Sequence, residues 1–468
     1  MLRRALALIP ALVLFGVVAG PSTQAGPLSP AGAQPAPLTY IDPGPGGFMS
    51  PNISYVATLA NESPGVSARV VQVGAVKRLY VSSAKGLSVY NVTNPAVPLL
   101  MGALYTHNWE NEDVAVSADG HWVLMSDFEG ILYLIVIHVQ DLPGGLVSLT
   151  VEGKETAHQG NHTIECVDAS PTCDWAYGSE GKIYDLRDKA NPTYVGEWKS
   201  AAGGRTGHHV TRDATGLIWT DTTPIYALNV SDPAQPVEVA HSDASQMGVK
   251  KTAYQHNNLR PYAAEYKPRI TDEDKADPNL RPGELLLGEG ETNFSPSCNS
   301  GSGPFTTYSL RDFDQPGAKP FKPIDVFRPV QGNYQDGNPE VNGLGCSGHW
   351  FDISSDNSTH DHIVTANGWY EHGTRIFDVD GKTGKIKQLG FFQPVVGSTS
   401  SAYWIDKNYI YSVDYERGVD ILKYDPSKNL VPSKAQFRAS WLAKLGVNDP
   451  VAAAERYLCR RAATGRNT

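Results

Sequence analysis

Short stretches of alternating apolar and polar residues run along most of the chain, each followed by a turn rich in Asn, Asp, Gly and Pro. Alternation with a period of two is the pattern of a β-strand, and these turn residues reverse the chain between strands. One phrase recurs, clearest as NVTNPAVPLLMG at 91–102, DLRDKANPTYVG at 185–196 and NVSDPAQPVEVA at 229–240, with degenerate copies at 310–327 and 377–392. The pattern predicts antiparallel strands from one end of the chain to the other.

The phrase returns at a period of about 40–50 residues, which indicates a repeat architecture. We count seven units, whose central strands are expected at 79–83, 122–127, 175–179, 217–221, 284–289, 362–367 and 409–414. Units of four strands without distinct polar capping repeats favour a closed ring over a linear solenoid. The predicted fold is therefore an all-β, seven-bladed β-propeller.

The two ends of this array complement each other. The last unit ends after its third strand at 419–424, while Ile53–Leu59 (ISYVATL) has no earlier strand with which to pair. We expect Ile53–Leu59 to be the outer strand of the last blade, because this pairing hides two open sheet edges. The propeller would span 53–432, between a Pro/Gly-rich lead-in at 34–52 and a short helical tail at 433–468.

The N-terminus has the pattern of a secretory signal peptide. Arg3 and Arg4 precede an apolar run over 5–19 and then small and Pro-rich residues; the run is too short to span a membrane. We assign 1–33 to this signal and find no later membrane span, so the protein is predicted to be secreted, as a monomer. A formal net charge of −10 argues against a nucleic-acid partner, since phosphate binding requires a basic face.

Five cysteines follow the predicted signal, as suits an oxidising compartment. Cys166 and Cys173 bracket a turn sequence that contains DASPT, and a bridge between paired strands is geometrically accessible. Cys298 and Cys346 flank a long loop-rich stretch. We expect both pairs to be bridged and Cys459 to be free; the alternative is free buried thiols.

The recurring Asn/Asp-Val-Ser/Thr-Asp/Asn-Pro-x-x-Pro-x-x-Val-Gly phrase resembles the LVIVD repeats of secreted or surface propeller proteins of bacteria. The likeness covers most of 53–425 and is strongest at 87–102 and 225–240. It implies a propeller and export. It implies no catalytic residues, because that family has no shared reaction.

Histidines occur where the inner strands of several units begin, in the sequences NHTIEC, GHHV, QHNN and GHWFD, and an acidic residue takes this place in WENEDV. Inner strands of a propeller all start on one face around the central channel, so these side chains should converge. Imidazoles and a carboxylate are ligands that Zn, Cu, Fe or Mn ions take. The predicted divalent-metal ligands are His162, His208 or His209, His256 and His349, with Glu112 among them. The alternative is a hydrated channel in which the same residues only bind water.

Other polar residues are expected at the same channel mouth. The candidates for ligand binding there are Arg69, Glu112, Glu289, Glu291, His372 and Tyr403. Trp109, Trp350, Trp369 and Trp404 either form an aromatic platform for a sugar or fill gaps between blades.

Common catalytic motifs are missing from the sequence: it contains no G-x-S-x-G, H-E-x-x-H, Walker loop or dinucleotide fingerprint. The leading hypothesis is an extracellular binding or interaction module that uses its channel-mouth face to bind a protein, a glycan or a small molecule. The alternative is a metal-dependent enzyme, a hydrolase or an oxidoreductase, with a histidine-lined site near the axis. No catalytic residue is assigned.

Overall fold

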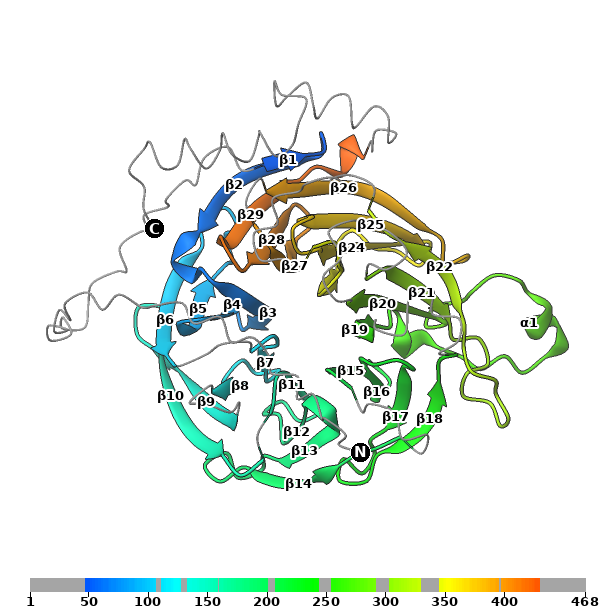
Figure 1. Ribbon diagram of the computed structural model, residues 1–468, viewed down its shortest axis with the longest axis horizontal. Helices are drawn as coiled ribbons and strands as arrows, with labels where there is room; N and C mark the ends of the chain where they lie inside the picture. Colours follow the sequence, from blue (N-terminus) through cyan, green and yellow to red (C-terminus); the bar gives the residue numbers. More distant parts are fainter. Residues whose placement is uncertain are drawn as a thin grey trace, which may run out of the picture. The chain divides into compact units, whose positions relative to one another are not determined.

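A computed structural model describes residues 47–106, 111–127, 133–158, 160–200, 207–243, 254–291, 303–329, 345–394 and 397–429. In these ranges the chain forms strands β1 to β29, a few 3-10 turns, and a single α-helix, α1 (Asp272–Ala276). The strands make seven separate antiparallel sheets around a common axis (Figure 1). The predicted all-β, seven-bladed propeller is therefore confirmed.

Each sheet is one blade, and its strands follow one another from the axis outwards (Figure 1). The first four blades comprise β3 (Gly65–Val73), β4 (Val76–Ser83), β5 (Gly86–Asn91) and β6 (Leu99–Tyr105); β7 (Ala115–Val116), β8 (Trp122–Asp127), β9 (Tyr133–Leu142) and β10 (Leu146–Glu155); β11 (Ile164–Cys166), β12 (Trp175–Gly178), β13 (Lys182–Asp185) and β14 (Thr193–Glu197); and β15 (Val210–Arg212), β16 (Leu217–Thr220), β17 (Tyr226–Asn229) and β18 (Val237–His241).

The remaining three blades comprise β19 (Tyr254–Leu259), β20 (Leu285–Glu291), β21 (Phe305–Ser309) and β22 (Pro323–Phe327); β23 (Phe351–Ile353), β24 (His362–Gly368), β25 (Thr374–Asp380) and β26 (Ile386–Pro394); and β27 (Thr399–Asp406), β28 (Tyr409–Asp414) and β29 (Gly418–Tyr424). All seven predicted central strands are present, within a few residues of the expected bounds.

The ring closes through the N-terminal part of the chain, as predicted. Strand β2 (Ile53–Leu59) pairs antiparallel with β29 and becomes the outer strand of the seventh blade, with Ile53 opposite Tyr424 and Leu59 opposite Val419. A further strand, β1 (Gly47–Met49), was not predicted. It adds to the outer edge of β26 as a fifth strand of the sixth blade, so one short segment covers an edge that would otherwise be open.

The core consists of seven hydrophobic clusters, and each cluster lies between two neighbouring blades. The second and third strands of each blade are therefore buried on both faces, which explains nearly continuous apolar runs such as YLIVIHV in β9. Outer strands such as β14 alternate exposed and half-buried residues, because only one of their faces meets a neighbour. The alternation that first indicated strands thus comes mainly from the rim of the ring.

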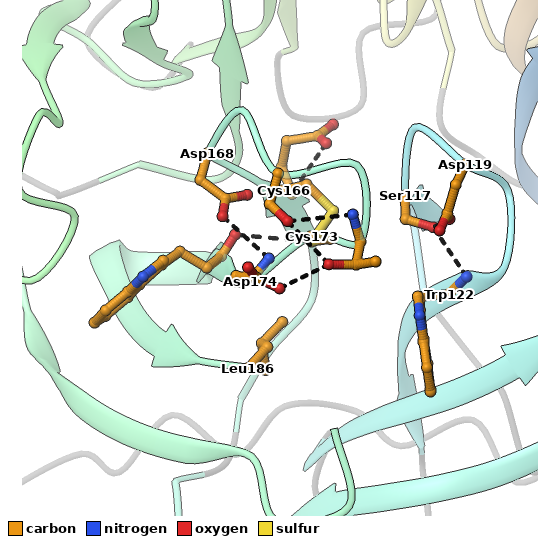
Figure 2. Close-up of a disulfide and its surroundings, with 12 residues drawn as sticks. Ser117, Asp119, Trp122, Cys166, Asp168, Cys173, Asp174 and Leu186 are labelled. Carbon is orange, nitrogen blue, oxygen red and sulfur yellow. Dashed lines mark hydrogen bonds between the residues drawn. A yellow bond between two sulfur atoms is a disulfide. The ribbon is translucent and has the colours of Figure 1, made fainter. Parts of the chain in front are cut away.

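The disulfide Cys166–Cys173 joins the end of β11 to the turn before β12, with a Cα–Cα distance of 5.4 Å (Figure 2). This predicted bridge is confirmed. Inside the turn, the carboxylate of Asp168 accepts a hydrogen bond from the backbone N–H of Asp174 at 3.1 Å. Cys346 is also disulfide-bonded. Cys298, its predicted partner, and Cys459 lie outside the described residues.

Two further expectations fall on other parts of the chain. The predicted signal peptide and the predicted helical tail lie outside the described residues. In the part that the structure describes, no helix is long and apolar enough to cross a membrane.

Candidate metal centre

Five of the predicted site residues come from five consecutive blades, at equivalent points of their inner strands. Glu112 stands shortly before β7, His162 before β11, His208 before β15 and His349 before β23, while His256 lies within β19. The inner strands all lie next to the axis (Figure 1). A shared register in successive repeats thus brings residues together that are far apart in the chain.

These five side chains converge on a single atom, the Oε2 oxygen of Glu112. The Nε2 atoms of His162 and His256 lie 3.1 Å from it, and those of His208 and His349 lie 3.3 Å from it. Donors at about 2.0–2.2 Å from one ion, set at right angles, are about 3 Å apart. The separation of each imidazole from Glu112 is therefore that of neighbouring ligands of one transition-metal ion, and the side chains form two triads that share Glu112: one with His256 and His349, the other with His162 and His208. We call these five residues the axial cluster.

The hydrogen bonds made by Nδ1 determine the tautomers of His256 and His349. Nδ1 of His256 donates to the backbone carbonyl of His349 at 3.1 Å, and Nδ1 of His349 donates to that of Ser400 at 3.0 Å. Because a carbonyl only accepts, the neutral tautomer has its proton on Nδ1 and a lone pair on Nε2. In neutral His256 this lone pair faces the carboxylate of Glu112 and is available to a cation. Burial lowers the pKa of His349, but Glu112 outweighs this and raises it above its usual value, so this ring can instead carry a proton towards the carboxylate.

Burial and charge set the protonation of the axial cluster. Burial lowers the pKa of His208 to about 4 and that of His256 well below its usual value, so both imidazoles are neutral at pH 7. Burial opposes the ionisation of Glu112, but the charges of His162 and His349 outweigh it and hold the pKa of this carboxyl well below its usual range. Neutral imidazole and ionised carboxylate are the forms that bind metal.

The adjacent residues of the chain form a different cluster. Nε2 of His209 lies 2.7 Å from Asp113 and its Nδ1 lies 2.7 Å from Asp221, while Arg69 contacts Asp113 at 3.4 Å and pairs with Glu165. Burial lowers the pKa of His209, but Asp113 outweighs this and raises it well above its usual value. Every charge in this ion-pair cluster has an opposite charge beside it. His208, rather than His209, therefore faces Glu112.

Arg69, a candidate for ligand binding, takes part in this ion-pair cluster. Tyr403 is placed between the seventh and first blades, where its hydroxyl accepts a hydrogen bond from the backbone N–H of Ala68 at 3.3 Å. His372 is buried in the turn before β25. None of these three side chains is among the contacts of Glu112 given above.

Two acidic candidates lie near the end of β20. Glu289 is buried and accepts a hydrogen bond from Asn367 at 2.9 Å, and burial raises its pKa well above the usual range. Glu291 accepts one from the hydroxyl of Tyr370 at 2.6 Å. Tyr370, two residues before the candidate His372, packs its ring 4.8 Å from that of His349.

The tryptophans do not form an exposed platform. Trp350, Trp369 and Trp404 are all buried, and the last two belong to clusters between blades. Trp350 packs its ring edge-on at 4.7 Å from both His209 and His256. Trp350 therefore packs against the imidazoles and fills space between blades. Trp109 lies outside the described residues.

No family model matches the chain, and no curated protein matches it in sequence. Many solved structures are similar in fold. One is the Cps50 (Swd1) β-propeller domain of Myceliophteria thermophila, with 12% identity and a TM-score of 0.51, covering 80% of this chain and 100% of that one. Another is a putative 6-phosphogluconolactonase from Bacteroides uniformis, with 11% identity and a TM-score of 0.49, covering 74% and 90%. At such identities the likeness concerns the fold alone.

Proposed function

We propose that this chain is a metal-binding β-propeller whose axial cluster holds one divalent transition-metal ion. The observation that carries the proposal is the convergence of four imidazole Nε2 atoms on one oxygen of Glu112, at 3.1–3.3 Å.

The donor set also indicates the kind of metal. Four nitrogens and one carboxylate suit Zn, Cu, Fe or Mn, whereas Ca and Mg prefer sites made of oxygen. The ion-pair cluster also brings Asp113, Glu165 and His209 together, but two cations, Arg69 and His209, already pair with its carboxylates and would repel a metal ion. We therefore assign one ion to each chain.

We further propose that the protein acts outside the cell as a binding module, with the channel-mouth face as its contact surface. The support is the signal-like sequence at 1–33, the bridge Cys166–Cys173 and the resemblance of the repeats to LVIVD proteins. Propellers commonly present binding surfaces of this kind. The partner would be a protein, a glycan or a small molecule.

A metal-dependent enzyme, hydrolase or oxidoreductase, is the second candidate. The observation in its favour is the unequal exposure of the imidazoles: the side chains of His162 and His208 are 25% and 15% exposed, while those of His256 and His349 are fully buried. The cluster is therefore open to solvent on one side, which a substrate would need.

Metal analysis of the purified protein tests the proposal most directly. The protein should be expressed with export to an oxidising compartment, purified without a metal-affinity tag and measured by inductively coupled plasma mass spectrometry. We expect about one transition-metal ion per chain, removable by a chelator and restored by added Zn²⁺ or Mn²⁺. A chain that stays metal-free after incubation with Mn²⁺, Fe²⁺, Co²⁺, Cu²⁺ and Zn²⁺ contradicts the proposal.

A further inference from the structure

We propose that the outer rim of the fifth blade carries a second binding site, a basic cleft that takes a small polyanion with several sulfate or phosphate groups. The cleft has a volume of about 670 Å³, within the range of small-molecule sites. It lies between α1 and the connection from β21 to β22, outside the ring of blades (Figure 1). The inference goes beyond the proposed function and does not depend on an ion in the axial cluster.

Positive charge gathers in this cleft, although the chain as a whole carries a formal net charge of −10. Its described lining contains four cationic side chains and one carboxylate, that of Asp312. The cations are Lys275, Arg311, Lys319 and Lys322. Such a local excess of positive charge attracts an anion against the field of the rest of the molecule.

Three of these cations are not neutralised by a carboxylate. In the ranges that the structure describes, no ion pair involves Lys275, Lys319 or Lys322, and all three are exposed. An exposed lysine of the neighbouring sixth blade does pair, since Lys382 lies 2.9 Å from Asp361. The ammonium groups in the cleft are therefore available to a ligand.

Acidic residues close to the cleft have other partners. Asp314 accepts a hydrogen bond from the hydroxyl of Tyr266 at 2.7 Å, and Asp274 accepts one from Arg281 at 2.8 Å. Helix α1 has three acidic residues in its first turn, but only Lys275 of this helix is in the lining. The charge that a ligand would meet is therefore mainly positive.

Both walls of the cleft are held in place by the protein itself. Behind α1, the buried guanidinium of Arg269 donates to both carboxylate oxygens of Glu284 at 2.6 Å and to the backbone carbonyl of Asp274 at 2.7 Å. The guanidinium of Arg311 donates to the backbone carbonyl of Lys275, which joins the two walls. A site that is formed in advance loses less entropy when it binds.

The lining indicates recognition by charge rather than by stacking. Phe321, the one aromatic residue in the described lining, is buried, so a base or a sugar ring finds no exposed ring on which to stack. Lysine ammonium groups bind anionic oxygens as point charges on flexible stems. The ligand class is therefore a chain of sulfate or phosphate groups, such as a fragment of a sulfated glycan or a polyphosphate.

Fluorescence anisotropy with a labelled, fully sulfated heparin tetrasaccharide and the full-length protein tests the inference. We expect binding in about 50 mM NaCl that weakens strongly at about 300 mM, since salt screens exposed charges. The double variant Lys319→Gln/Lys322→Gln should bind the probe about tenfold more weakly, as suits the loss of two exposed ion pairs. Titration with tripolyphosphate, scored by displacement of the probe, distinguishes the two sources: the tighter of the two ligands names the source.

The matched control is Lys407→Gln/Lys423→Gln, which removes two exposed lysines of the seventh blade and changes the net charge equally. This variant should bind the probe as the wild type does, and circular dichroism checks that both double variants are folded. Equal weakening in both would reduce the effect to overall charge and overturn the site. Absence of binding, or equal binding of the same tetrasaccharide without sulfate groups, also overturns it. None of these results changes the metal content, which tests the proposed function separately.

Discussion

The axial cluster and the ion-pair cluster share two chain segments, yet they have opposite characters. Glu112 and His208 belong to the first, and Asp113 and His209, one residue further on, belong to the second. Successive residues of an extended chain point in opposite directions, so these two segments each supply both clusters. In one cluster an acid meets four imidazoles and no fixed cation. In the other, each acid meets Arg69 or a protonated His209.

The difference shows that residue type alone does not decide whether a histidine is a ligand. What decides is whether its charges and lone pairs are already satisfied by the protein. His209 has a carboxylate at each ring nitrogen, and a buried charge that is paired on both sides serves the structure. His349 has a backbone acceptor at Nδ1, while its Nε2 shares one oxygen of Glu112 with three other imidazoles.

The largest effect is expected from a ligand in the axial cluster. His256→Ala should lose the ion, with affinity reduced by more than the roughly 100-fold that loss of an outer contact costs, while the far-ultraviolet circular dichroism stays that of a β-protein. Metal content by mass spectrometry and competition with a coloured chelator measure this. The matched control is His241→Ala, a half-exposed histidine at the end of β18, which should keep the ion. A His256→Ala protein that retains stoichiometric metal removes this residue from the site.

A substitution in the ion-pair cluster should lower the stability of the protein and leave its metal content unchanged. His209→Ala leaves Asp113 and Asp221 buried without their partner, which typically costs about 3–5 kcal/mol of unfolding free energy. Urea unfolding of the metal-free protein measures the loss. Metal stoichiometry of the folded fraction should be unchanged, and a variant of wild-type stability that lacks metal would exchange the roles of the two histidines.

Acid and alkali should separate the two clusters as well. The pKa of His208 is lowered from 6.5 in the unfolded chain to about 4 in the folded protein. The free energy of unfolding should therefore be full above pH 6.5 and fall as the pH drops towards 4, by at most about 3 kcal/mol. The pKa of His209 is raised in the folded protein. The stabilisation that protonated His209 gives is therefore fully present below pH 6.5 and is lost as the pH rises through its folded pKa.

The free energy of unfolding of the metal-free protein, measured between pH 4 and 9, tests these two opposite pH dependences. The difference between wild type and His208→Ala isolates the acid side, and that between wild type and His209→Ala isolates the alkaline side. Differences that do not vary with pH, or that vary with the opposite sign, contradict the assignment. The bound ion should also dissociate over the acid range, since protons compete for the imidazoles.

The smallest effect concerns the disulfide next to the ion-pair cluster. Cys166 directly follows Glu165, which pairs with Arg69, and the bridge closes a loop with a sequence separation of 7. Replacing both cysteines by serine should cost about 2 kcal/mol on loop entropy alone. Metal affinity should change by less than a factor of about three, since none of the five ligands changes. A loss of metal in this variant would show that the two clusters are not independent.

The sequence predicts the blades well, because each blade is specified locally by its own strands and turns. Alternation and Pro-containing turns predicted the central strands β8 and β28 with the same bounds that the structure shows. Repeat register then predicted which histidines converge, since residues at the same place in successive blades share one radius. β1 escaped prediction because three residues in a Pro/Gly-rich stretch carry no periodic signal.

The division between the two clusters could not be predicted, because it depends on which face each side chain takes. His208 and His209 are neighbours with the same side chain, and only the start of β15 decides which one meets Glu112. The contact of Tyr370 with Glu291 could not be predicted for a related reason, as it results from contacts between blades five and six. Asp221 was overlooked although it follows a central strand that the pattern identified.

The closing strand β2 has a consequence for how the protein is made. Its partner β29 follows about 370 residues later, so at a synthesis rate of roughly 5–20 residues per second the strand waits for roughly 20 to 75 seconds. Until then an apolar segment with unpaired backbone groups is exposed to any other sheet edge in its surroundings. We expect the nascent chain to depend on holding factors during this interval, and the last blade to be the slowest part of the molecule to acquire protection from protease.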